Sequence, residues 1–162
     1  MKTGQGVLAL SCLLFLQSCG SPDSRSVTGG LDDEALVEEI DAVIEGIVAG
    51  AARVDADAVL ASSAGEDSLT LVVGDVLLSG HDEILGRFRE SYEPLQSQEH
   101  TLVEKRIRIL GPDIALALLT AWGTYTDDAG WTSDPVGLGL TLVLVRRDGR
   151  WRLTHAHQSF IE

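Results

Sequence analysis

Two apolar stretches that meet at Asp148-Gly149 constrain the fold of this chain more than any other part of its sequence. An Asp-Gly pair between such stretches is typical of the two-residue turn that closes a β-hairpin. We therefore predict that residues 138–147 and 150–160 form two long antiparallel strands. The position of the turn also predicts which residues of the two strands lie opposite each other.

The register of this hairpin determines where two histidines point. Regular pairing from the turn places residue 155 opposite residue 142 and residue 157 opposite residue 140, and opposed residues share a face. We expect helices to cover that face because it also carries the apolar residues Leu138, Leu140, Leu142, Leu144, Trp151 and Leu153. Both His155 and His157 are therefore predicted to point into the interior, unless a bulge breaks the register.

Three interpretations of His155 and His157 stay open at this stage. A buried imidazole needs hydrogen-bond partners, so the two residues can be structural members of the core. They can also line a cavity between sheet and helices, where they would bind a ligand or act as acid and base. A His-x-His pair on one strand face can supply two metal ligands, but the sequence offers no identifiable third ligand, so we predict no metal.

The rest of the sequence predicts helices first and strands later. Apolar residues recur at helical spacing from Asp32 to Ala51, and Asp55 begins a second short helix that ends near residue 64. Gly46 and Gly50 weaken the first helix but allow a neighbour to approach it closely. The remaining elements are a hairpin, a third helix and two further strands, over 69–79, 84–92, 101–110 and 114–126. This order indicates an α+β fold.

The N-terminus has the pattern of an export signal. Lys2 precedes an apolar stretch that is too short to span a bilayer, and residues 1–18 are predicted to be a signal peptide. The tetrapeptide Leu-Gln-Ser-Cys at 16–19 resembles the bacterial lipobox, which implies a diacylglycerol thioether and an N-acyl chain such as palmitate on Cys19. The alternative is an ordinary secretory peptide. Residues 19–30 are small and polar, so they are predicted to be a flexible tether to the domain at 31–162.

Charge and cysteine content exclude several classes of function. The formal net charge is −13, and such an acidic chain repels the phosphates of nucleic acids. The two cysteines are Cys12, in the predicted leader, and Cys19, which the lipid would block. The mature domain is therefore predicted to have no disulfide, no cysteine-based zinc site and no cysteine nucleophile.

The C-terminal segment Gly149-Arg-Trp-Arg-Leu-Thr-His-Ala-His-Gln-Ser159 resembles the end of SnoaL-like, or DUF4440-type, domains of the NTF2-like superfamily. Asp55 and Gly80, at the starts of two predicted helices, and the Arg-Asp-Gly turn at 147–149 fit the same pattern. The resemblance covers about residues 32–160. It implies a cone in which a strongly curved antiparallel sheet wraps around N-terminal helices and leaves a pocket. It also implies homodimers through the outer sheet face, for which Val143, Val145 and Ala156 are candidates.

These observations predict an exported, lipid-anchored protein of the cell envelope. Its place would be the outer membrane or the periplasmic face of the inner membrane in a Gram-negative cell. We expect its domain to bind a small, largely apolar molecule, or to serve as an assembly module, without a cofactor. The alternative is an isomerase, cyclase or hydrolase with His155 or His157 as general acid or base. Trp122 and Tyr92 are candidate walls of the pocket in either case.

Overall fold

The computed structural model describes residues 31–65 and 68–161. The predicted signal peptide, Cys19 and the predicted tether therefore lie outside the described residues. None of the described helices is long and apolar enough to cross a membrane. The described elements are α1 (Leu31–Ala52), α2 (Ala56–Leu60), β1 (Thr70–Val73), β2 (Val76–Ser79), α3 (His81–Tyr92), β3 (Leu95–Gly111), β4 (Ile114–Asp127), β5 (Val136–Arg147) and β6 (Arg150–Ile161).

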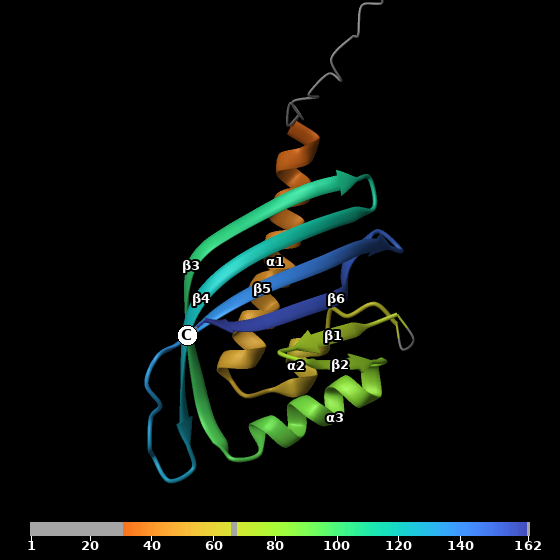
Figure 1. Cartoon of the computed structure of the whole chain (residues 1–162). Coiled ribbons are helices and arrows are strands. Elements are labelled where there is room, and N and C mark those ends of the chain that lie inside the picture. Colours follow the sequence, from red (N-terminus) through yellow and green to blue (C-terminus); the bar gives the residue numbers. More distant parts are fainter. Residues whose placement is uncertain (1–30, 66–67, 162) are drawn as a thin grey trace, which may run out of the picture.

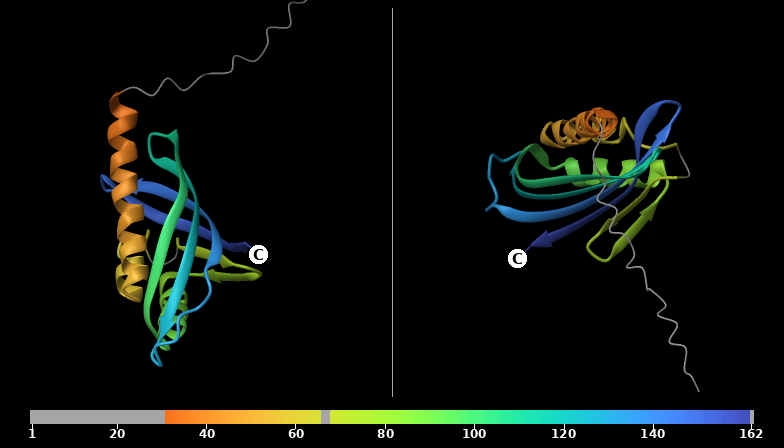
Figure 2. Two further views of the ribbon diagram at one scale, coloured as in Figure 1. Left: turned by 90° about the vertical axis from the view of Figure 1, so that its left-hand side faces the viewer. Right: turned by 90° about the horizontal axis from the view of Figure 1, so that it is seen from above.

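The strands form one curved sheet of six strands in the order β2-β1-β6-β5-β4-β3. Adjacent strands of the sheet are antiparallel, except that β1 runs parallel to β6. Figure 1 shows the long strands β3 to β6 side by side, and Figure 2 shows α1 lying across the concave side of the sheet. The predicted α+β fold, with a curved sheet around N-terminal helices, is confirmed.

The core fills the space between α1 and the concave face of the sheet. Ile40 and Ile44 come from one face of α1 and are almost fully buried. They pack with leucines and alanines that alternate along β4 and β5, and with Trp151 of β6. Near the end of α1, Gly50 allows α2 to approach closely, because a Cβ at this position would lie 2.7 Å from the Val59 backbone nitrogen.

The turn between β5 and β6 has the predicted conformation. Asp148 and Gly149 both have a positive φ, of 52° and 72°, which is the backbone that a two-residue hairpin turn of the I′ type requires. Pairing starts regularly from the turn, with Arg147 opposite Arg150 and Leu144 opposite Leu153. The hairpin is therefore confirmed near its turn.

The predicted register is wrong beyond Leu153, because Thr154 forms a β-bulge. Val143 lies opposite His155, and Thr141 lies opposite His157, so both histidines share a face with odd-numbered residues of β5. A segment far away in the sequence is hydrogen-bonded to β6 at this bulge. The Leu153 N–H donates to the Ser62 carbonyl (2.8 Å), the Leu153 carbonyl accepts from the Ala64 N–H (2.7 Å), and the Thr154 hydroxyl donates to the Ser68 carbonyl (2.8 Å).

A second β-bulge changes which residues of β3 face the interior. This strand begins at Leu95, earlier than the predicted start at residue 101, and its pairing with β4 shifts between Leu102 and Glu104. Val103 is the extra residue and is 62% exposed, although regular alternation over residues 101–110 would place it on the same side as Ile107. The residues before the bulge that face the helices are therefore Gln98, His100 and Leu102.

Candidate ligand cavity

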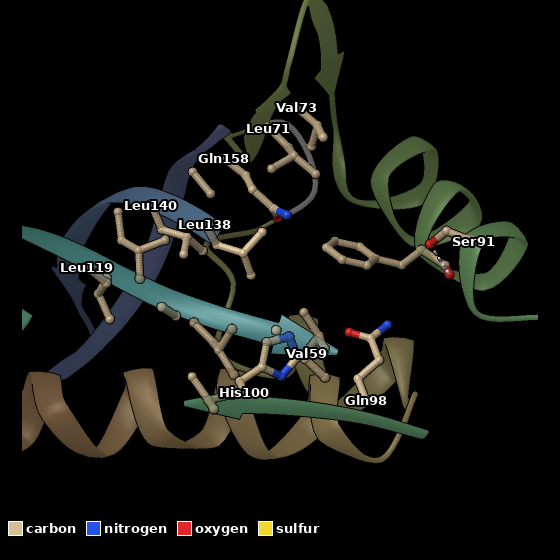
Figure 3. Close-up of a pocket in the computed structure, with 18 of the residues that line it drawn as sticks. Val59, Leu71, Val73, Ser91, Gln98, His100, Leu119, Leu138, Leu140 and Gln158 are labelled. Carbon is tan, nitrogen blue, oxygen red and sulfur yellow. Dashed lines mark hydrogen bonds between the residues drawn. The ribbon is translucent and has the colours of Figure 1, made fainter. Parts of the chain in front are cut away.

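A cavity of about 720 Å³ lies between the concave face of the sheet and the helices α1 and α3. Its wall is mainly apolar, because the inward positions of β4 and β5 carry alanines and leucines and because the C-terminal half of α1 contributes aliphatic residues. Figure 3 shows a selection of the lining side chains, among them Val59, Leu71, Val73, Leu119, Leu138 and Leu140. A cavity of this size can hold an organic molecule of ordinary drug size.

Several uncharged polar side chains interrupt this apolar wall, and three of them, Gln98, His100 and Gln158, carry an amide or an imidazole. Gln98 and His100 project side by side from β3, and Gln158 points into the cavity from β6 on the opposite wall (Figure 3). None of the side-chain hydrogen bonds within residues 31–65 and 68–161 involves any of these three side chains. Their hydrogen-bonding capacity is therefore available inside the cavity.

His100 has the most distinctive environment of the three. Its Nδ1 atom is buried and has no hydrogen-bond partner among the described residues. Burial lowers the pKa of the imidazole below its ordinary value of about 6.5, so the ring is neutral at pH 7. Gly123 lies opposite His100 on β4, and a Cβ at that glycine would lie 3.4 Å from the His100 Cδ2 atom. The glycine therefore leaves space beside the ring.

Tyr92, at the end of α3, also lines the cavity. Its ring packs against Phe88, with the ring centroids 5.6 Å apart. Burial raises the pKa of Tyr92 to about 12, because the phenolate would lose its hydration. The hydroxyl is therefore protonated throughout the physiological range and can donate a hydrogen bond.

The charged residues of the cavity wall are largely paired. Lys105 of β3 binds the Asp41 carboxylate on α1, with both side chains half-buried. Arg87 of α3 forms an exposed pair with Glu90 at 3.6 Å. Within residues 31–65 and 68–161 no group of three histidine, cysteine or acidic side chains is arranged to hold a metal ion.

The other sequence-predicted site residues lie elsewhere. The bulge at Thr154 turns His155 and His157 to the convex face, where the His155 Nδ1 atom is 2.7 Å from the Thr70 hydroxyl and His157 is exposed. Trp122 also points to that face, because its neighbour Ala121 points inward, and it is 50% exposed. None of these three side chains lines the cavity.

Residues 40–162 match the family described as the SnoaL-like domain. The chain belongs to this family. No curated protein matches the chain.

Solved structures share the fold of this SnoaL-like domain at low identity. An NTF2-like superfamily protein from Salmonella enterica has a TM-score of 0.70 and 14% identity, over 78% of this chain and 91% of that one. A ketosteroid isomerase-like protein from Erwinia carotovora has a TM-score of 0.65 and 22% identity, over 77% of this chain and 95% of that one. The association domain of CaMKII from C. elegans has a TM-score of 0.64 and 17% identity, over 79% of this chain and 98% of that one. The predicted NTF2-like fold is confirmed by these structures.

The polar residues of this SnoaL-like domain were not found from the sequence pattern. His100 follows the polar segment Gln96-Ser-Gln-Glu99, which lacks the apolar alternation by which strands are recognised. A weaker signal was present, because Gln98, His100 and Leu102 are spaced two apart and precede a clear strand. Following that spacing backward from Leu102 would have placed His100 on one face with Gln98.

Proposed function

We propose that this protein is a lipid-anchored protein of the bacterial cell envelope, whose SnoaL-like domain binds a small, largely apolar molecule. The observation that carries the proposal is the cavity of about 720 Å³ under the curved sheet. Binding of an apolar ligand would be favourable because the ligand and the aliphatic wall both lose contact with water. The few polar groups of the wall would orient that ligand.

Binding is better supported than acid–base catalysis. The candidate bases His155 and His157 lie on the convex face of the sheet, away from the cavity. His100 does line the cavity, but its Nδ1 atom has no partner that would orient the ring and fix its tautomer. Catalytic histidines act with such a third group, so His100 is suited to contact a ligand rather than to move a proton.

The proposed anchor rests on the sequence at the N-terminus. The apolar stretch before Cys19 and the small residue Ser18 fit a lipoprotein signal peptide, and the polar residues 20–30 would separate the lipid from α1. The DUF4440-type assignment within the SnoaL-like group is likewise part of this proposal, because it depends on the C-terminal motif around Trp151.

Binding in the cavity can be measured with N-phenyl-1-naphthylamine, an apolar dye that becomes fluorescent in apolar surroundings. We expect the wild-type protein to bind the dye with micromolar affinity. We expect Ala121→Phe to bind it at least tenfold more weakly, which corresponds to a loss of roughly 1.4 kcal/mol or more of binding free energy. Ala121 is buried in the cavity wall, so a phenylalanine there would occupy the ligand's space.

Thr120→Phe is the matched control for this experiment. Thr120 precedes Ala121 on β4 and faces the convex side of the sheet, so the same ring should leave dye affinity unchanged. Circular dichroism establishes that both variants are folded. The proposal fails if the wild-type protein does not bind the dye, or if both variants bind it as tightly as wild type.

We also propose that the domain forms a homodimer through the convex face of the sheet. Val143 and Val145 are half-buried there, and Leu118 is 38% exposed at the same surface. A solved structure with this fold is an association domain, which supports an assembling role for the domain. Ala156, a third candidate for this interface, instead lines the cavity because of the bulge at Thr154.

Sedimentation velocity tests the homodimer. We expect the wild-type domain to sediment as a dimer at micromolar concentration, and Leu118→Arg to sediment as a monomer, because an arginine would place an unpaired charge in the interface. Glu93→Arg introduces the same side chain at the exposed end of α3 and should leave the dimer intact. A monomeric wild-type protein at these concentrations would contradict the proposed interface.

A further inference from the structure

We propose that Gln98, His100 and Gln158 form a charge-neutral recognition site for an uncharged hydroxyl or carbonyl group on an otherwise apolar ligand. This inference rests on the proposed function, since it assumes that the cavity holds a ligand. It adds the chemical class of that ligand, which is a neutral alcohol or ketone rather than a carboxylic acid.

The position of the three side chains supports a shared role. Gln98 and His100 lie on β3, and Gln158 faces them from β6 across the cavity (Figure 3). Each amide offers an N–H donor and a carbonyl acceptor, and neither amide takes part in a side-chain hydrogen bond within residues 31–65 and 68–161. Polar groups inside an apolar cavity gain most from a ligand that supplies the missing hydrogen bonds.

His100 can form a hydrogen bond with either a hydroxyl or a carbonyl group of a ligand. Its Nδ1 atom is buried without a partner among the described residues, and the residue lines the cavity, so Nε2 is the ring nitrogen left for a ligand. The tautomer of a histidine is normally fixed by the hydrogen bond that its other nitrogen makes. Because no such bond is present at Nδ1, Nε2 can donate to a carbonyl or accept from a hydroxyl. Gly123 keeps space free beside the ring.

The charges around the cavity disfavour an ionised ligand. Of the two cations of the wall, Lys105 is paired with Asp41, and Arg87 is a solvent-exposed side chain 3.6 Å from Glu90, so neither places an unpaired buried charge in the cavity. Glu45 of α1 is an exposed anion at the wall, and the chain has a net charge of −13. A carboxylate would therefore lose its hydration without gaining a counter-charge, which is unfavourable.

Three pyrenes that differ in one substituent test this inference, with affinities measured by fluorescence at pH 7.5. We expect 1-pyrenemethanol to bind the wild-type protein roughly five- to tenfold more tightly than 1-methylpyrene, as one or two hydrogen bonds would give. We expect 1-pyrenecarboxylate to bind at least roughly tenfold more weakly than the alcohol.

Variants then locate the preference. In Q98L/H100F/Q158L the advantage of the alcohol over 1-methylpyrene should vanish, while 1-methylpyrene should bind at least as tightly as before. His100→Phe alone should lose part of the advantage, which provides a second test if the triple variant does not fold. His157→Phe is the matched control on the convex face and should bind all three probes as wild type does.

The outcomes separate this inference from the proposed function. If 1-methylpyrene binds but the alcohol binds no more tightly, or if the carboxylate binds as well as the alcohol, the recognition site is overturned and the binding cavity stands. An unchanged preference in the triple variant also overturns it. If neither the pyrenes nor N-phenyl-1-naphthylamine bind the wild-type protein, both proposals fail.

Discussion

Replacement of Cys19 by serine is expected to transfer the protein completely from the membrane fraction to the soluble fraction of its host. Only a thiol can form the thioether to diacylglycerol, so a serine leaves the chain without its acyl groups. Each buried methylene contributes roughly 0.8 kcal/mol to membrane binding, and two or more acyl chains together give stable anchoring. Fractionation of cells, together with incorporation of labelled palmitate, measures the effect.

The other cysteine of the chain provides the control for this experiment. Cys12 lies inside the apolar stretch of the predicted leader, so Cys12→Ser should leave fractionation and labelling as in wild type. If the leader is an ordinary secretory peptide, the wild-type protein will already be soluble and unlabelled. If Cys19→Ser remains at the membrane and still takes up label, the anchor lies elsewhere and the proposal is wrong.

Gly50→Ala is expected to lower the free energy of unfolding by about 1–3 kcal/mol, the range measured for overpacked interiors. A Cβ at this position would lie 2.7 Å from the Val59 backbone nitrogen and 2.9 Å from the Ala58 carbonyl carbon. Both atoms belong to the backbone of α2, so a rotamer change cannot relieve the clash. Denaturation in urea, followed by circular dichroism, measures the loss.

Gly46→Ala is the matched control in the same helix. An added Cβ at Gly46 would meet no atom within 4 Å, and the residue is exposed. Alanine is a better helix former than glycine, so this variant should gain roughly 0.5–1 kcal/mol. Opposite signs for the two variants would establish that α2 approaches α1 at Gly50. A gain in stability at both positions would contradict that contact.

The parts of the fold that depend on neighbouring residues could be predicted from the sequence. The φ angles of Asp148 and Gly149 are required by their own turn, and α3 ends close to Pro94 because proline cannot continue a helix. The spacing of Ile40 and Ile44 likewise identified the buried face of α1. These signals act over a few residues, so the order of helices and strands could be predicted from them.

The site could not be predicted in the same way, because its side chains depend on two bulges. The bulge at Thr154 is held by hydrogen bonds to Ser62, Ala64 and Ser68, which are separated from it by more than eighty residues. A pattern of alternation within one strand contains no trace of such contacts. The register prediction therefore assigned His155 and His157 to the concave face. His100 was overlooked because its strand begins with polar residues.

The bulge at Thr154 has a consequence for how related proteins should be compared. Alternate side chains of a strand face the interior of the protein and its outer surface. A single additional residue in the strand exchanges these two sets of side chains from that residue onward. Two homologues can therefore carry the same His-x-His motif at the same aligned position and use it on opposite sides of the sheet. At about 20% identity, transfer of a functional assignment within this family requires matching the strand irregularities before matching the residues.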